Sequence, residues 1–228
     1  MDYNYIFFDC ETNSGRSHAD ILTISALFVD KNFKLIEEFN CAARLRKSRI
    51  YEIDSFLVNG MDPFEVDKHP FSNFDLTKKT NDKFISWINK GPVLFCAHNG
   101  YQFDYMLTST HLFTNLFTWP WIFSTGNAKQ IDSLPILQNF DFYAPNTIAV
   151  ELNEKSNKTF KLSSLCRMNG FDLGDKAHTA EADTSGMNRL MKLISKKNPE
   201  LFKKCISLND KKNVLSSIKD VDYFCHPE

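Results

Sequence analysis

The feature that most constrains the fold is an apolar run near the N-terminus that ends on carboxylates. Residues 3–10 are nearly all apolar, and Asp9 and Glu11 close the run. Such a run is typical of a strand buried on both faces. Side chains two residues apart lie on the same face of a strand, so Asp9 and Glu11 can point into one site. A carboxylate at the end of a buried strand is costly unless it is paired or binds a metal ion.

The rest of the chain predicts a meander of strands followed by alternating helices and strands. Further strands are predicted at 21–30, 33–39 and 93–97, with residues 41–76 forming a loop with short helical pieces. This order favours one α/β domain with a mixed sheet. Helices are predicted near 79–90, from about Phe103, and at 131–140, 160–169, 180–196 and 199–218.

Composition sets the class of protein. The chain has 228 residues, 43% of them apolar, which is enough for a packed core and excludes wholesale disorder. It contains no apolar run of the roughly 18–20 residues that a membrane helix needs and no signal-peptide pattern. We therefore expect an intracellular protein, cytoplasmic or nucleoid-associated, without a membrane partner. The six cysteines are scattered, which favours reduced thiols, several of them in the core, over a zinc site.

Charge is distributed unevenly along the chain. The net charge of −1 argues against a protein that coats nucleic acid by bulk charge. Residues 155–220, however, carry 14 lysines and arginines against 7 acids. The simplest interpretation is a solvated helical face. The alternative is a rim that holds a phosphate backbone beside an acidic metal site, and charge alone leaves both open.

Two further motifs place acids near predicted helix starts. His98 follows the strand at 93–97, and Asp104 opens the next helix. His178 precedes Asp183 by five residues, an offset that puts the two roughly 140° apart on a continuous helix. They can converge only if His178 lies in a loop and Asp183 on the first turns. Taken singly, each has an ordinary explanation: a packed histidine, a helix N-terminal acid, an exposed loop histidine.

Taken together, the motifs predict a metal-dependent phosphodiester hydrolase. Such an enzyme needs three or four carboxylates around two hard cations. It also needs a base that titrates near neutral pH, and histidine suits that role. The candidate catalytic set, in chain order, is Asp9, Glu11, Asp104, His178 and Asp183.

The order D-x-E, N-x-x-x-F-D and H-x-A-x-x-D resembles the DEDD exonuclease superfamily (DnaQ-like), in the subgroup with histidine (DEDDh). Within it, the chain looks most like the catalytic domain of the bacterial exonuclease I family, from about residue 5 to about 205. The ordered set of motifs is specific, although each alone is not. The matching segments are 7–12, 58–65, 99–104, 119–121, 132–134, 161–165 and 178–183.

The resemblance implies a ribonuclease H-like fold with a mixed five-stranded sheet flanked by helices. It implies an exonuclease domain over residues 1–205. Residues 206–228 lie beyond the resemblance, and we expect them to form a lysine-rich helical tail packed on the same domain. The resemblance also implies two Mg²⁺ or Mn²⁺ ions and release of nucleoside 5′-monophosphates from a 3′ end. Asp9, Glu11, Asp104 and Asp183 would hold the metals, and His178 would take the proton from the attacking water.

The same resemblance assigns substrate contacts. Thr12 would lie against the terminal nucleotide, with Asn59 and Met61 framing its base and sugar. Asn99, Tyr101 and Phe103 complete the candidates, although core packing is the favoured role of Phe103. Tyr101, Phe103, Trp119 and Trp121 are candidates for base stacking. Lys129 and Lys161 are candidates for phosphate contacts, with solvated surface lysines as the alternative. Strand alternation turns Cys10 away from the carboxylates, so we expect it in the core.

The predicted partner is single-stranded nucleic acid, with DNA favoured over RNA. An exoribonuclease is the closest alternative, because discrimination rests on 2′-hydroxyl contacts that a sequence does not show. A non-catalytic nucleic-acid-binding or polymerase-associated subunit of the same fold is a second alternative, and the intact set of five residues counts against it. A role in DNA repair, a polymerase or repair partner, nucleoid association and the oligomeric state are left open.

Overall fold

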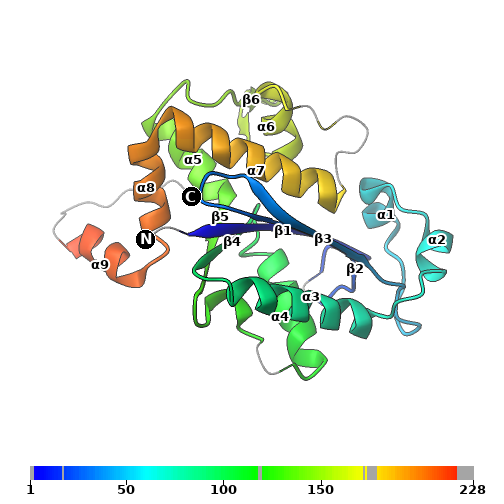
Figure 1. Ribbon diagram of the computed structural model, residues 1–228. Helices are drawn as coiled ribbons and strands as arrows, with labels where there is room; N and C mark the ends of the chain where they lie inside the picture. Colours follow the sequence, from blue (N-terminus) through cyan, green and yellow to red (C-terminus); the bar gives the residue numbers. More distant parts are fainter. Residues whose placement is uncertain (1–2, 17, 118–119, 172, 174–178, 220–228) are drawn as a thin grey trace.

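A mixed five-stranded sheet forms the centre of the protein (Figure 1). The computed structural model describes residues 3–16, 18–117, 120–171, 173 and 179–219. The strand order is β3-β2-β1-β4-β5; β1, β2 and β3 run antiparallel, whereas β4 and β5 run parallel to β1. The predicted mixed sheet is therefore confirmed. The strands are β1 Asn4–Thr12, β2 Ile21–Val29, β3 Leu35–Ala42, β4 Val93–Ala97 and β5 Ala128–Asp132.

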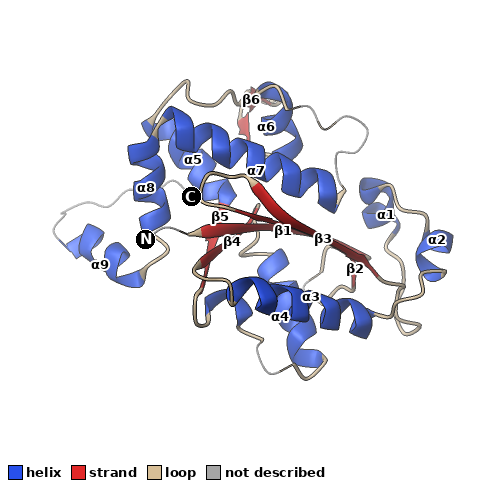
Figure 2. Ribbon diagram, in the orientation of Figure 1, coloured by secondary structure: helices blue, strands red, loops and turns tan. Residues whose placement is uncertain are grey.

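Helices cover both faces of the sheet (Figure 2). On one face lie α3 Asn73–Ile88, α4 Asp104–Thr114 and the short η1 Ile122–Ser124. On the other lie α5 Ser133–Tyr143, α6 Leu162–Met168, α7 Ala180–Lys197 and α8 Pro199–Ser207. The remaining elements are α1 Ile53–Asn59, α2 Pro63–Asp67, α9 Lys211–Lys219 and a two-stranded ribbon of β6 Glu151–Leu152 and β7 Lys158–Thr159.

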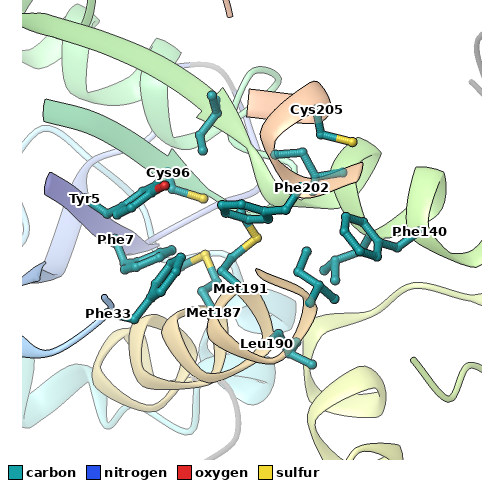
Figure 3. Close-up of a cluster of buried hydrophobic side chains, with 14 of the residues drawn as sticks. Tyr5, Phe7, Phe33, Cys96, Phe140, Met187, Leu190, Met191, Phe202 and Cys205 are labelled. Atoms are coloured by element: carbon teal, nitrogen blue, oxygen red, sulfur yellow. The ribbon is translucent and has the colours of Figure 1, made fainter. Parts of the chain in front are cut away.

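The alternation of β1 divides its side chains between two cores. Phe7 packs in the core under α7, around Met187, Leu190 and Met191 (Figure 3). Phe8 enters the opposite core with residues of α3 and α4. Because side chains two residues apart lie on the same face of a strand, Asp9 and Glu11 lie on the α7 side of the sheet together with Phe7.

Cysteine placement agrees with the sequence. Cys10 is buried in the core on the α3 side, as predicted, with its sulfur 3.7 Å from Thr108 Oγ1. The cysteines in the described part of the chain are all buried and free of disulfides. None of the helices in that part has the length and apolar character that a membrane crossing requires.

The predicted order of elements needs two corrections. The single helix at 199–218 is wrong: α8 ends at Ser207 and α9 starts at Lys211. Asp210 accounts for the restart, because its side chain accepts a hydrogen bond from the backbone N–H of Lys212 (2.9 Å). The second correction is β5, a five-residue strand that was not predicted; it ends at Asp132, so the helix predicted at 131–140 starts two residues later, at Ser133. The predicted boundary after residue 205 lies inside α8 and stays a prediction.

Candidate active site

Three acids from two distant segments meet at one end of β1. Carboxylate oxygens of Asp9, Glu11 and Asp183 all lie within 4.8 Å of one another. Asp9 and Glu11 come from β1, and Asp183 from the first turn of α7. That turn is held over the sheet by a contact between Ser25 Oγ and Thr184 Oγ1 (3.2 Å). The structure therefore brings together acids that lie more than 170 positions apart in the chain.

Asp104 is placed beside this cluster by a backbone contact. It is the first residue of α4, is 3% exposed, and accepts a hydrogen bond from the Cys10 N–H at 3.0 Å. Cys10 lies between Asp9 and Glu11 in β1. The four acids of the predicted metal set are thus neighbours. We call Asp9, Glu11, Asp104 and Asp183 the carboxylate cluster.

Burial and mutual repulsion disfavour ionisation of these acids. Burial, followed by repulsion from Asp183 and Asp104, raises the pKa of Glu11 to about 8. Burial raises the pKa of Asp104 to about 7, opposed by backbone hydrogen bonds and assisted by the charges of Asp132 and Asp183. Asp9 is affected in the same direction, since burial and then the charges of Asp104, Glu11 and Asp183 raise its pKa.

The donor set of the carboxylate cluster fits a hard divalent cation. Mg²⁺ and Mn²⁺ prefer carboxylate oxygens, and a cation removes the repulsion that raises these pKa values. A group of buried carboxylates with raised pKa values is also typical of a functional site. The carboxylate cluster can therefore bind divalent cations and hold their positive charge at this end of β1.

A groove of about 570 Å³ opens next to Glu11. Asn59 and Met61 line it from the end of α1 and the turn after it, and β2, β3 and the start of α7 complete it. The Asn59 side-chain amide donates to the Thr12 carbonyl (3.2 Å), which ties α1 to the end of β1. Thr12 itself is buried, and its hydroxyl donates to the Ser14 carbonyl (2.7 Å).

The other predicted substrate residues lie around the turn between β4 and α4. The N–H groups of Asn99 and Tyr101 donate to the Asp132 carboxylate, and the exposed Tyr101 hydroxyl donates to the Gln130 carbonyl (3.1 Å). Phe103 packs against the core on the α3 side, in agreement with the role favoured for it. The described residues lining the groove include none of these three.

Several other candidates can now be placed. His98 is packed, with its ring nitrogens 2.9 Å from Ser133 Oγ and 2.8 Å from the Phe160 carbonyl oxygen. Lys129 pairs with Asp210 (2.9 Å), whereas Lys161 and Trp121 are exposed. His178 and Trp119 lie outside the described residues.

Asp132 lies beside Asn99 and Tyr101, although no sequence pattern gives it a role. It accepts hydrogen bonds from three backbone N–H groups, those of Asn99, Tyr101 and Leu134. The one sequence signal for Asp132 is its position at the start of a segment, 132–134, that resembles the exonuclease I family.

Sequence comparison gives two relatives of the chain, both named exodeoxyribonuclease I. One, from Buchnera aphidicola subsp. Schizaphis graminum, is 28% identical over 98% of this chain and 45% of its own. The other, from Buchnera aphidicola subsp. Acyrthosiphon pisum, is 25% identical over 97% of this chain and 52% of its own. No model of a known protein family matches the sequence.

Structure comparison gives the same similarity. Escherichia coli exonuclease I in complex with a dA16 oligonucleotide superposes with a TM-score of 0.86 at 19% identity, covering 94% of this chain and 45% of the other. Exonuclease I from Methylocaldum szegediense superposes with a TM-score of 0.85 at 17% identity, covering 96% of this chain and 46% of the other. The expected ribonuclease H-like fold is thereby confirmed. The chain resembles exonuclease I over nearly its whole length, as the motifs predict, and spans about half the length of these relatives.

Proposed function

We propose that the protein is a metal-dependent 3′→5′ exonuclease that hydrolyses single-stranded DNA to nucleoside 5′-monophosphates. The observation that carries the proposal is the carboxylate cluster, where three acids from β1 and α7 offer oxygens within 4.8 Å of one another. The similarity to proteins named exodeoxyribonuclease I supports the reaction class. Solved exonuclease I structures with single-stranded DNA support the substrate class.

The carboxylate cluster would hold two Mg²⁺ or Mn²⁺ ions. Asp9, Glu11 and Asp183 would bind one, and Asp9 and Asp104 would bind the second, with Asp104 acting directly or through a water. Bound ions of this kind lower the pKa of a water nucleophile and neutralise charge on the phosphate. A zinc-bound exonuclease I–DNA complex, with a TM-score of 0.86 at 20% identity, supports metal binding on this fold.

The protein's own residues have separate roles in this proposal. His178 accepts the proton of the attacking water. Histidine suits this role because its ordinary pKa leaves a neutral imidazole available near physiological pH. Asn59 and Met61 hold the terminal nucleotide in the groove beside Glu11, against the backbone of Thr12. Asn99, Tyr101 and Phe103 contribute by shaping the turn that leads to Asp104. With single-stranded DNA as the substrate, we also propose that the partner is a repair protein or a polymerase and that the protein associates with the nucleoid.

The test is digestion of a 5′-labelled DNA oligonucleotide and of RNA with the same sequence, with Mg²⁺ or Mn²⁺. We expect a ladder of DNA products shortened from the 3′ end and mononucleotides with a 5′-phosphate. A faster ladder on RNA would replace the DNA assignment with the exoribonuclease alternative. Internal cuts, or no cleavage of either strand with bound metal, would contradict the proposal.

A further inference from the structure

The turn between β4 and α4 determines where Asp104 points, and its construction is unusual. Asn99 has a positive φ of 59°, a left-handed conformation that is uncommon outside glycine. At Gly100 an added Cβ would approach Ala97 Cβ to 2.4 Å and the Tyr105 ring to 3.1 Å. Below the turn, the buried Tyr105 hydroxyl donates to the Ile131 carbonyl (2.7 Å). The backbone is therefore held tightly against both β4 and β5.

Asp132 is the side chain that binds this turn. It ends β5, directly opposite Ala97 of β4, and is 5% exposed. Its Oδ1 accepts from the N–H groups of Asn99 (2.9 Å) and Leu134 (2.9 Å), and its Oδ2 accepts from the N–H of Tyr101 (3.2 Å). Both oxygens are engaged, and two of the three donors belong to the turn. Hydrogen bonds to an ionised acceptor are the stronger kind.

The turn passes this restraint on to Asp104. The N–H of Phe103 donates to the Gly100 carbonyl (3.1 Å), as does that of Tyr105 (3.0 Å), so the start of α4 rests on the turn. Asp104 then accepts from the Cys10 N–H (3.0 Å), next to Asp9 and Glu11. Asp132, the turn and Asp104 thus form one connected path from β5 to the carboxylate cluster.

We propose that Asp132 is a positioning residue for the reaction, which orients Asp104 toward Asp9 and Glu11 by binding the 99–101 turn through both of its carboxylate oxygens. The inference rests on the proposed function, because it assigns Asp104 to the metal site. It requires a carboxylate at position 132. An asparagine of the same shape keeps one acceptor oxygen, but its NH₂ group faces an N–H donor where Oδ2 stood.

The Asp132→Asn variant separates positioning from folding. Asparagine is as good an N-cap as aspartate, so the cap of α5 at Leu134 is retained. Asp30→Asn is the matched control. Asp30 also accepts from two backbone N–H groups, those of Asn32 (2.8 Å) and Lys34 (2.9 Å), but in the β2–β3 turn at the opposite end of the sheet.

The experiment is Mn²⁺ titration of the metal-free proteins by calorimetry at a temperature where all are folded, followed by steady-state digestion of single-stranded DNA. We expect Asp132→Asn to bind Mn²⁺ about 10- to 100-fold more weakly and to lower kcat with little change in KM, and Asp30→Asn to match wild type. Asp132→Asn with wild-type Mn²⁺ affinity and kcat would overturn the inference, as would equal losses in Asp30→Asn. Wild-type protein that neither binds Mn²⁺ nor digests DNA would instead overturn the proposed function.

Discussion

The carboxylate cluster should destabilise the metal-free protein at alkaline pH, and Glu11→Gln tests this. In the folded protein the pKa of Glu11 is raised from 4.5 to about 8. A carboxyl group whose pKa is raised on folding contributes fully to the stability of the folded state below its unfolded pKa. That contribution is lost as pH rises through its folded pKa. The ionised Glu11 therefore costs the metal-free folded state up to about 5 kcal/mol at pH 8 and almost nothing near pH 4.5.

Glutamine has nearly the same shape and no charge, but it still buries a polar amide. We therefore expect Glu11→Gln to regain about 2 kcal/mol at pH 8, or about 4–8 °C in Tm for a domain of this size. The assay is thermal and urea unfolding in EDTA at pH 5 and pH 8. Glu154→Gln, in an exposed turn, is the control for a lost surface charge and should leave Tm unchanged.

Added Mn²⁺ should reverse the ranking of wild type and Glu11→Gln at pH 8. A ligand that binds only the folded state stabilises it, by about 2.7 kcal/mol at 100 times its Kd. Wild type should gain this stabilisation from bound Mn²⁺. Glu11→Gln should gain less, because it has lost one donor of the carboxylate cluster. A variant no more stable than wild type in EDTA at pH 8, or equally more stable at pH 5, would refute the reasoning.

Three further predictions concern packing and proton transfer. Phe8→Ala should cost about 3–5 kcal/mol in urea unfolding, because this fully buried ring contacts four other aromatic rings; a loss below about 1 kcal/mol would contradict that packing. Gly186→Ala should lower Tm, since the new Cβ would lie 2.7 Å from Cys166 Sγ. The same change in a Cys166→Ala background should raise Tm through helix propensity, and equal effects in both backgrounds would exclude the clash. Activity should rise with pH through the reference histidine pKa of about 6.5, and His178→Ala should lose activity while keeping its Tm and Mn²⁺ affinity; a flat profile between about 5.5 and 8 would argue against the base.

The acids of the site could be predicted because their positions follow local rules. Strand alternation puts Asp9 and Glu11 on one face of β1, and a helix start places Asp183 on the first turn of α7. Asp104 depended on more than local pattern, because its partner is a backbone N–H 94 positions away. Resemblance to a known family supplied the order in which these acids combine.

Other features depend on contacts that a linear pattern does not show. The β5 strand has only five residues, with Lys129 and Gln130 inside it, and is defined by its pairing with β4. Asp132 carries no signature of its own, because the three backbone N–H groups that it binds are brought around it only by the fold. The break between α8 and α9 is marked by side-chain hydrogen bonds within an otherwise helical pattern, among them that of Asp210 with the Lys212 N–H.

The most direct test of the central claim compares wild type with Asp9→Asn on a single-stranded DNA oligonucleotide, with Mg²⁺ and with EDTA. The substitution keeps the shape of a side chain at the centre of the carboxylate cluster and removes its charge. We predict 3′→5′ digestion by wild type with Mg²⁺, none in EDTA, and at least about a 100-fold loss in folded Asp9→Asn. Equal digestion by the two proteins, or digestion that persists in EDTA, would contradict the assignment of this site.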